Sequence, residues 1–150
     1  MPQERKQVTL EGAQLLFKNF AGAEAQYNTA GDRNFAVLLD ADTADGLAKD
    51  GWNVRTLESK EEGEPDAFYL PVTVSYKNQP PRIVMITSRG KENIGEDLVD
   101  VLDYAQMANV DLICNGYDWT VNGKSGTKAY LKTMYVTIEE DFLERKYANI

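Results

Sequence analysis

Aromatic and basic side chains alternate near the C-terminal end of the chain. In a β-strand every second side chain points to the same face, so Lys128, Tyr130 and Lys132 begin one face of a predicted strand over residues 127–138. No acid lies between Lys124 and Lys132, although the net charge of the chain is −8. Single-stranded nucleic acids are bound by rings on which bases stack and by cations that contact phosphates. The first candidate nucleic-acid-binding residues are therefore Tyr117, Trp119, Lys124, Lys128, Tyr130 and Lys132.

The dipeptide Asn122-Gly123 predicts a hairpin turn between residues 110–121 and 127–138, because both residue types tolerate a positive φ. A two-residue loop at this dipeptide places Tyr117 opposite Lys128. A four-residue loop over 123–126 shifts the pairing but keeps the same aromatic and basic side chains on one face. Only a loop of odd length or a β-bulge would separate them.

An alternative interpretation of this hairpin is purely structural. Aromatic residues are good strand formers, and the rings would then pack inward while the lysines are solvated. The far end of the same face, at Met134, Val136 and Ile138, is apolar and belongs in a core. The strand must therefore twist or bend between its two ends.

A second cluster of basic and aromatic residues surrounds the proline-containing turn at residues 78–81, which we expect to join two strands as a hairpin. A hairpin tip with exposed basic residues is common, so this pattern is weaker. Its candidate binding residues, together with one at the start of an earlier strand, are Tyr76, Lys77, Arg82 and Arg33.

The composition excludes several kinds of catalysis. The chain has no histidine and one cysteine, Cys114. Serine or cysteine nucleophiles activated by histidine are therefore excluded within this chain, as are zinc sites with histidine ligands and an intrachain disulfide. We expect no cofactor, no metal and no enzymatic activity.

Three fragments resemble catalytic or metal-binding motifs, and each lacks a required residue. Gly123 and the Lys-Ser after it resemble the end of a phosphate-binding loop, but Asp118 stands where that motif requires glycine. Residues 40–46 resemble a calcium loop whose twelfth position is Gly51 instead of glutamate. A nuclease-like arrangement of acid and lysine has Ser75 in place of its second carboxylate.

The remaining pattern predicts a β-rich α+β domain, with a barrel or a strongly bent sheet. A short helix is expected after Asp42 as its N-cap, ending before Gly51. The strongest helical periodicity lies at residues 93–108, and the segment from Glu92 to Asp111 carries six acids and no base. Strands are expected at 8–18, 33–40, 52–57, 67–77, 82–88, 110–121 and 127–138.

The length of 150 residues suits one domain, with a mildly acidic tail at 139–150. No apolar run approaches the roughly 20 residues that a membrane helix needs. The first six residues lack the apolar stretch of a signal peptide. We therefore expect a cytoplasmic protein that does not bind membranes.

Three short motifs stand out: Asn34-Phe35-Ala36-Val37-Leu38-Leu39-Asp40, Gly51-Trp52-Asn53-Val54 and Tyr117-x-Trp119-x-Val121-x-Gly123-Lys124-x-Gly126-x-Lys128-Ala129-x-Leu131. They resemble those of bacteriophage-encoded single-stranded-DNA-binding proteins, and the resemblance extends over about residues 8–138. The resemblance implies an elaborated OB-fold-like five-stranded barrel with extra strands, and one main helix between the central strands and the terminal hairpin. It also implies a role in protecting single-stranded DNA during replication or recombination.

The expected partner is single-stranded DNA, with RNA as an alternative ligand, and with a second copy of the chain or replication and recombination proteins as further partners. The competing hypothesis is a non-catalytic phage module that binds proteins. Its acidic faces would then be the binding surface, either in a virion component or in an inhibitor that mimics DNA. Binding of an oligonucleotide distinguishes the two.

Overall fold

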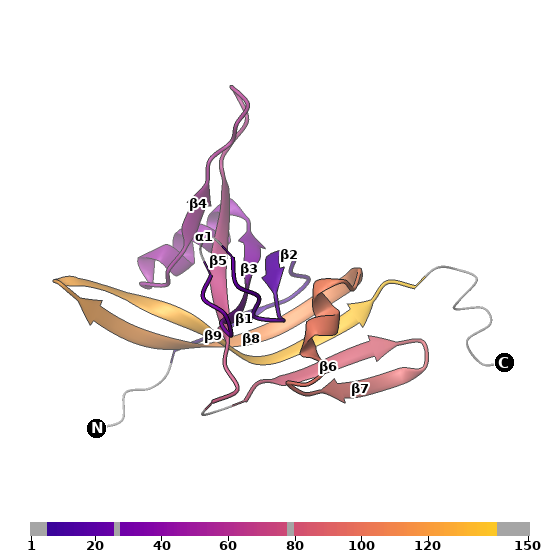
Figure 1. The fold of residues 1–150 in the computed structure, drawn as a ribbon. Helices are drawn as coiled ribbons and strands as arrows, with labels where there is room; N and C mark the ends of the chain where they lie inside the picture. The colour runs from indigo at the N-terminus through magenta and orange to yellow at the C-terminus, as the bar shows by residue number, and fades with distance from the viewer. Residues whose placement is uncertain (1–5, 26–27, 78–79, 141–150) are drawn as a thin grey trace.

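The computed structural model describes residues 6–25, 28–77 and 80–140, so most of the expected tail lies outside the described residues. Strands dominate this part of the chain, as predicted (Figure 1). The elements are β1 (Gln7–Leu10), β2 (Leu15–Asn19), β3 (Arg33–Leu39), α1 (Ala41–Lys49), β4 (Arg55–Leu57), β5 (Ala67–Val74), β6 (Arg82–Thr87), β7 (Gly90–Ile94), the 3₁₀ helix η1 (Val99–Asp103), β8 (Met107–Val121) and β9 (Lys124–Ile138).

The described strands form one sheet whose main path is β1-β8-β9-β5-β3-β2. The two ends of this path, β1 and β2, are separated in the chain by residues 11–14 only. The Ala13 amide donates to the Val110 carbonyl over 2.8 Å, and the Leu38 amide donates to the Gln14 carbonyl over 2.9 Å. One bent N-terminal segment therefore bridges both ends of an open mixed sheet. If this segment is counted as one bent strand, it makes with β8, β9, β5 and β3 the partly open five-stranded arrangement of an OB-like barrel, to which β4, β6 and β7 are added.

Strand β9 lies at the centre of this arrangement. It pairs antiparallel with β8, and parallel with both β5 and β6. The prediction that the turn at 78–81 joins a hairpin is wrong, because β5 and β6 do not pair with each other. They follow one another in the same direction along β9, and the break between them contains Pro80 and Pro81, which have no amide to donate to the ladder.

The short helix α1 is present as predicted, but its N-cap is Asp40 instead of Asp42. The Asp40 carboxylate accepts a hydrogen bond from the Thr43 amide over 2.7 Å, and this bond lowers the pKa of Asp40. Gly51 follows the C-cap with φ of 94°, a conformation that glycine adopts without strain.

The predicted helix at 93–108 is wrong. Its beginning belongs to β7, its end belongs to β8, and only η1 lies between them. The apolar spacing was misleading, because Leu98 and Val101 are 50% and 45% exposed while Val99 and Leu102 are fully buried. Residues of this segment therefore enter the core from a 3₁₀ helix and a strand instead of from one helical stripe.

The core fills the interior of the barrel. Trp52 and Cys114 both belong to it. The largest fully buried side chains are Phe20, Phe35, Leu70, Ile83, Leu102, Leu112 and Met134. Among residues 6–25, 28–77 and 80–140, no helix is long and apolar enough to cross a membrane.

Candidate nucleic-acid interface

The β8–β9 hairpin is the longest feature of the fold, and its turn reaches away from the barrel (Figure 1). Asn122 and Gly123 have φ of 51° and 79°, so they form the two-residue turn that their sequence predicts. Tyr117 lies opposite Lys128, which confirms the two-residue alternative and rules out the four-residue loop.

A β-bulge in β9 changes which side chains of the strand point into the core and which point to the surface. The register jumps from Ile113–Thr133 to Cys114–Leu131, so Lys132 is an extra residue without a partner in the ladder. Beyond the bulge, Met134 and Val136 point into the core. Before it, Lys128 is exposed. The bend predicted from the apolar end of the strand is therefore a bulge at Lys132.

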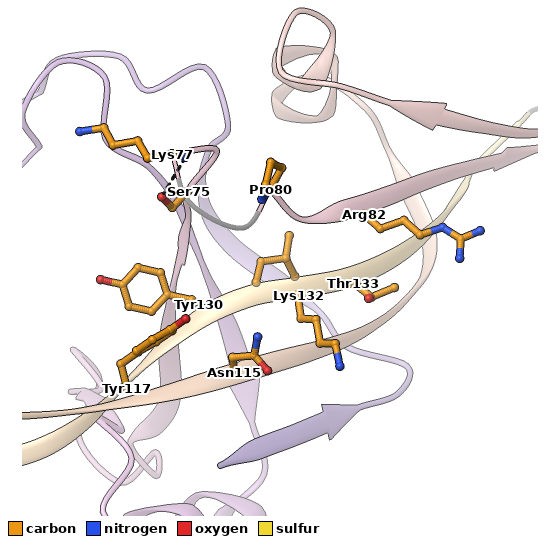
Figure 2. Close-up of a pocket in the computed structure, with 10 residues that line it drawn as sticks. Ser75, Lys77, Pro80, Arg82, Asn115, Tyr117, Tyr130, Lys132 and Thr133 are labelled. Atoms are coloured by element: carbon orange, nitrogen blue, oxygen red, sulfur yellow. Dashed lines mark hydrogen bonds between the residues drawn. The ribbon is translucent and has the colours of Figure 1, made fainter. Parts of the chain in front are cut away.

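An open pocket of about 600 Å³ lies where the hairpin meets the ends of β5 and β6. Figure 2 shows Tyr117 and Tyr130 side by side at one end of it, and Arg82 at the other. Five of the predicted site residues line this pocket, from three separate parts of the chain. Its lining residues are Ser75, Lys77, Pro80, Arg82, Asn115, Tyr117, Tyr130, Leu131, Lys132 and Thr133.

The two tyrosines form an edge-to-face pair with centroids 4.9 Å apart. The Lys128 ammonium lies over the Tyr130 ring, 5.2 Å from its centroid. Such a cation–π contact at an exposed site is worth about 0.5–1 kcal/mol, less than the roughly 1–3 kcal/mol of a stacked base. A base can therefore replace the ammonium on the ring, which frees Lys128 to contact a phosphate.

Trp119 and Lys128 line a neighbouring hollow of about 300 Å³, together with residues of β4 and β5. The Trp119 indole donates a hydrogen bond to Asn53 over 3.4 Å. Its ring also covers Gly126, since a Cβ at that position would lie 3.0 Å from Trp119 Cζ2. Because Gly126 has no side chain, the Trp119 indole can pack directly against the backbone at this position, which we call the seat of Trp119.

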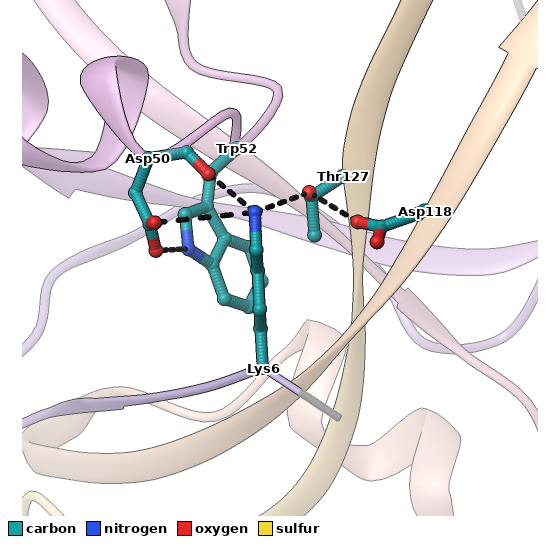
Figure 3. Close-up of polar contacts among 5 residues, drawn as sticks. All are labelled: Lys6, Asp50, Trp52, Asp118 and Thr127. Atoms are coloured by element: carbon teal, nitrogen blue, oxygen red, sulfur yellow. Dashed lines mark hydrogen bonds and ion pairs between the residues drawn. The ribbon is translucent and has the colours of Figure 1, made fainter. Parts of the chain in front are cut away.

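A polar cluster fixes the base of the hairpin against the N-terminal segment and the end of α1 (Figure 3). Lys6 Nζ donates to the Asp50 carbonyl over 2.5 Å and to Thr127 Oγ1 over 3.3 Å. Thr127 Oγ1 in turn donates to Asp118 over 2.8 Å, and the Trp52 indole donates to the Asp50 carboxylate over 3.2 Å. Thr127 is buried, so its hydroxyl holds the strand in place by two hydrogen bonds.

Three predicted site residues do not line either pocket. Lys124 lies at the exposed tip of the hairpin. Arg33 donates to the Phe20 carbonyl over 2.6 Å, pairs with Glu96 at 3.6 Å and lies over the Tyr76 ring. Burial raises the pKa of Tyr76. The structure thus gives Arg33 and Tyr76 contacts within the protein, and their nucleic-acid role stays a prediction.

The structure adds lining residues that sequence reasoning missed. Asn53 precedes β4, Arg55 is the first residue of β4, and Pro71 and Thr73 come from β5. In the sequence, Pro71 and Thr73 alternate with the apolar residues Leu70 and Val72. This alternation indicates that Pro71 and Thr73 lie on the outer face of β5. Nothing in the sequence indicated that β5 lies beside β9, because that parallel pairing joins residues far apart in the chain.

The electrostatics of this face differ from those of the whole chain. None of the residues that line the two pockets is acidic, whereas Lys77, Arg82, Arg55, Lys128 and Lys132 are basic. A local basic surface is thus present on a chain of net charge −8. An OB-like barrel with such a surface beside paired aromatic rings belongs to the class of nucleic-acid-binding modules.

Comparison with known proteins identifies the family. The chain belongs to the family described as "Putative phage ssDNA-binding domain", whose model matches residues 2–150. This finding confirms the resemblance inferred from the sequence motifs. A comparison with curated proteins gives no match.

Solved structures agree with the fold. The chain is similar to the "Single-stranded DNA-binding protein from bacteriophage Enc34 in complex with ssDNA", with a TM-score of 0.57, 7% identity, and coverage of 90% of this chain and 88% of that one. For the same phage protein described as a "C-terminal truncation", the TM-score is 0.56 at 7% identity, covering 90% and 87%. At such identities the similarity concerns the fold.

Proposed function

We propose that this chain binds single-stranded DNA along the outer face of β5, β9 and β8, without base-sequence preference and without a catalytic step. It protects exposed single strands during phage replication or recombination in the host cytoplasm. The observation that carries the proposal is the convergence of Tyr117, Tyr130 and Lys132 with Arg82 around one open pocket. Three separate segments contribute these side chains.

The mechanism combines stacking with charge. Tyr130 and Tyr117 offer ring surfaces to successive bases, while Lys132 and Arg82 at the other side of the pocket contact phosphates. Because rings accept any base and cations accept any phosphate, binding is tolerant of sequence. No acid lines the pocket, so no carboxylate of the lining repels the phosphates at close range.

The proposal is of a binding protein without a catalytic step. Among the residues that the structure describes, no three His, Cys, Asp or Glu side chains come together as candidate metal ligands. A nuclease of the carboxylate-and-metal type needs such a set to hold its ions, and incubation of an oligonucleotide in Mg²⁺ tests this part of the proposal.

A titration of fluorescent oligonucleotides tests this function. We expect single-stranded DNA to bind much more tightly than duplex DNA of the same length, because the bases of a duplex are not free to stack. Log affinity should fall with log salt at about −2 to −3.5, for three to five phosphate contacts at about −0.7 each. The oligonucleotide should stay intact in Mg²⁺. Equal affinity for both forms would contradict the stacking mechanism, and absence of binding would favour a protein-binding module. Parallel RNA titrations measure the DNA preference.

A further inference from the structure

Phe17 is an exposed aromatic residue held in an unfavourable backbone conformation. Its φ is 52°, in the left-handed region that bulky residues rarely adopt. The register between β2 and β3 shifts between Leu16 and Asn19, so Phe17 lies in an irregularity of the strand. Its side chain is 59% exposed. The backbone thus departs from the regular strand at a residue whose large apolar ring lies in water. Burial of the ring therefore does not explain this departure.

The Phe17 ring contacts Tyr69 of β5 edge to face, with centroids 5.6 Å apart. Tyr69 alternates with the buried residues Leu70 and Val72, so it points outward. Thr73 shares this outward face and is paired with Tyr130. The Phe17–Tyr69 pair and the tyrosines of the hairpin therefore lie on the same face of the sheet.

The space between the two aromatic pairs is open and basic. Arg55 is paired with Tyr69 across β4 and β5, and its guanidinium makes no side-chain hydrogen bond or ion pair with the residues that the structure describes. The hollow of about 300 Å³ that Arg55 lines extends to Trp119 and Lys128. From Tyr69 to Thr73 the strand rises about 13 Å, at about 3.3 Å per residue. This equals about four nucleotides at the 3.4 Å rise of a stacked strand.

We propose that Phe17 and Tyr69, with Arg55 beside them, form a second stacking site for the same single strand of DNA. The strand then runs from the Arg82 and Lys132 pocket, over the hairpin tyrosines, to β2. This inference rests on the proposed function and deepens it by assigning the far end of the site. The bound strand does not continue past Tyr69 and Arg55, because the loop that connects β4 to β5, residues 58–66, carries five acids that repel phosphates.

An oligothymidine length series tests the second site. For the natural chain, affinity should rise with length and reach a plateau. Tyr69→Ala and Phe17→Gly should lower the affinity of plateau-length oligonucleotides fivefold or more, the loss expected for one stacked base. In both variants, affinity should stop rising at an oligonucleotide length about two to four nucleotides shorter than for the natural chain. The affinity of the shortest oligonucleotides that bind should be unchanged. Tyr104→Ala is the control, because this ring is 88% exposed and lines neither pocket.

Phe17→Gly also separates binding from folding. Glycine adopts a positive φ without strain, so this variant should melt no earlier than the natural chain even though it has lost the ring. If both variants bind long oligonucleotides as the natural chain does, while Tyr130→Ala is impaired, the second site is wrong and the proposed function stands. If the natural chain binds no single-stranded DNA, both proposals fail.

Discussion

The Tyr117 and Tyr130 rings meet edge to face across β8 and β9, with their planes inclined by 80°. Such pairs contribute about 0.5–1.5 kcal/mol beyond the area they bury. Each ring therefore orients the other before any ligand arrives. A base that stacks on one tyrosine meets a ring that is already positioned, which reduces the conformational entropy lost on binding.

The first prediction concerns this coupling. Tyr117→Ala and Tyr130→Ala should each weaken oligonucleotide binding by about 1–3 kcal/mol without changing the salt slope. Because the rings touch, the double variant should lose less than the sum of the two single losses. Oligonucleotide titrations of the two single variants and the double variant form a double-mutant cycle that measures the coupling between the rings, with Tyr104→Ala as the control. Additive losses would show that the rings act independently.

The second prediction concerns charge. Lys132→Ala and Arg82→Ala should each weaken binding to all sequences and make the salt slope less steep by about 0.7, since each removes one phosphate contact. The control is Lys60→Ala, which removes an equal charge from a loop that lines neither pocket. A slope unchanged in the pocket variants, or reduced equally in the Lys60 variant, would contradict the placement of the phosphate contacts.

Local signals gave correct predictions where one short segment decides the outcome. The turn at Asn122 and Gly123 depends on the φ preferences of two adjacent residues, and both structure and register follow them. The change from an exposed to an apolar face within one strand predicted a twist or bend, and the structure has a bulge at Lys132. The start of α1 was misplaced by two residues, because several acids nearby are equally suitable caps.

Predictions failed where distant segments decide the outcome. The helical spacing at 93–108 was overridden because β8 is long and pairs with both β1 and β9, which draws residues from 107 onward into the sheet. The parallel pairing of β6 with β9 brings Arg82 to the pocket, and no local pattern encodes it. The position of Phe17 depends on a strand irregularity, which composition and periodicity do not reveal.

The third prediction concerns the seat of Trp119. An alanine Cβ at position 126 would lie 2.5 Å from Asn53 Oδ1 and 3.0 Å from Trp119 Cζ2, so both side chains must move. Gly126→Ala should therefore destabilise the fold by about 1–3 kcal/mol and shift one of the two indole N–H signals in an NMR spectrum. Ser125→Ala, at an exposed neighbour, should do neither. An unchanged indole spectrum in the Gly126 variant would show that Trp119 is not seated there.

The fourth prediction concerns the polar cluster at the hairpin base. Thr127→Val preserves the shape of a buried side chain but removes the hydroxyl that bonds Lys6 and Asp118. The expected loss of unfolding free energy is about 1–3 kcal/mol, because two partners lose a hydrogen bond. Urea unfolding measures it, with Thr137→Val on the same strand as the control. Equal stability of both variants would mean that the cluster contributes little.

The last prediction concerns the core thiol. Cys114 is fully buried, and burial raises its pKa to about 12. Since only the thiolate is nucleophilic, the folded protein should resist alkylation at pH 8 and react after unfolding in urea.

An unfolded thiol loses its proton near pH 8.5, whereas the folded thiol keeps its proton until about pH 12. The thiol's contribution to stability is therefore complete below about pH 8.5 and declines as the pH rises above it. Urea unfolding at pH 7.5 and pH 10 should show a smaller alkaline loss for Cys114→Ala than for the natural chain. Rapid alkylation of the folded protein, or equal alkaline losses, would contradict a buried neutral thiol.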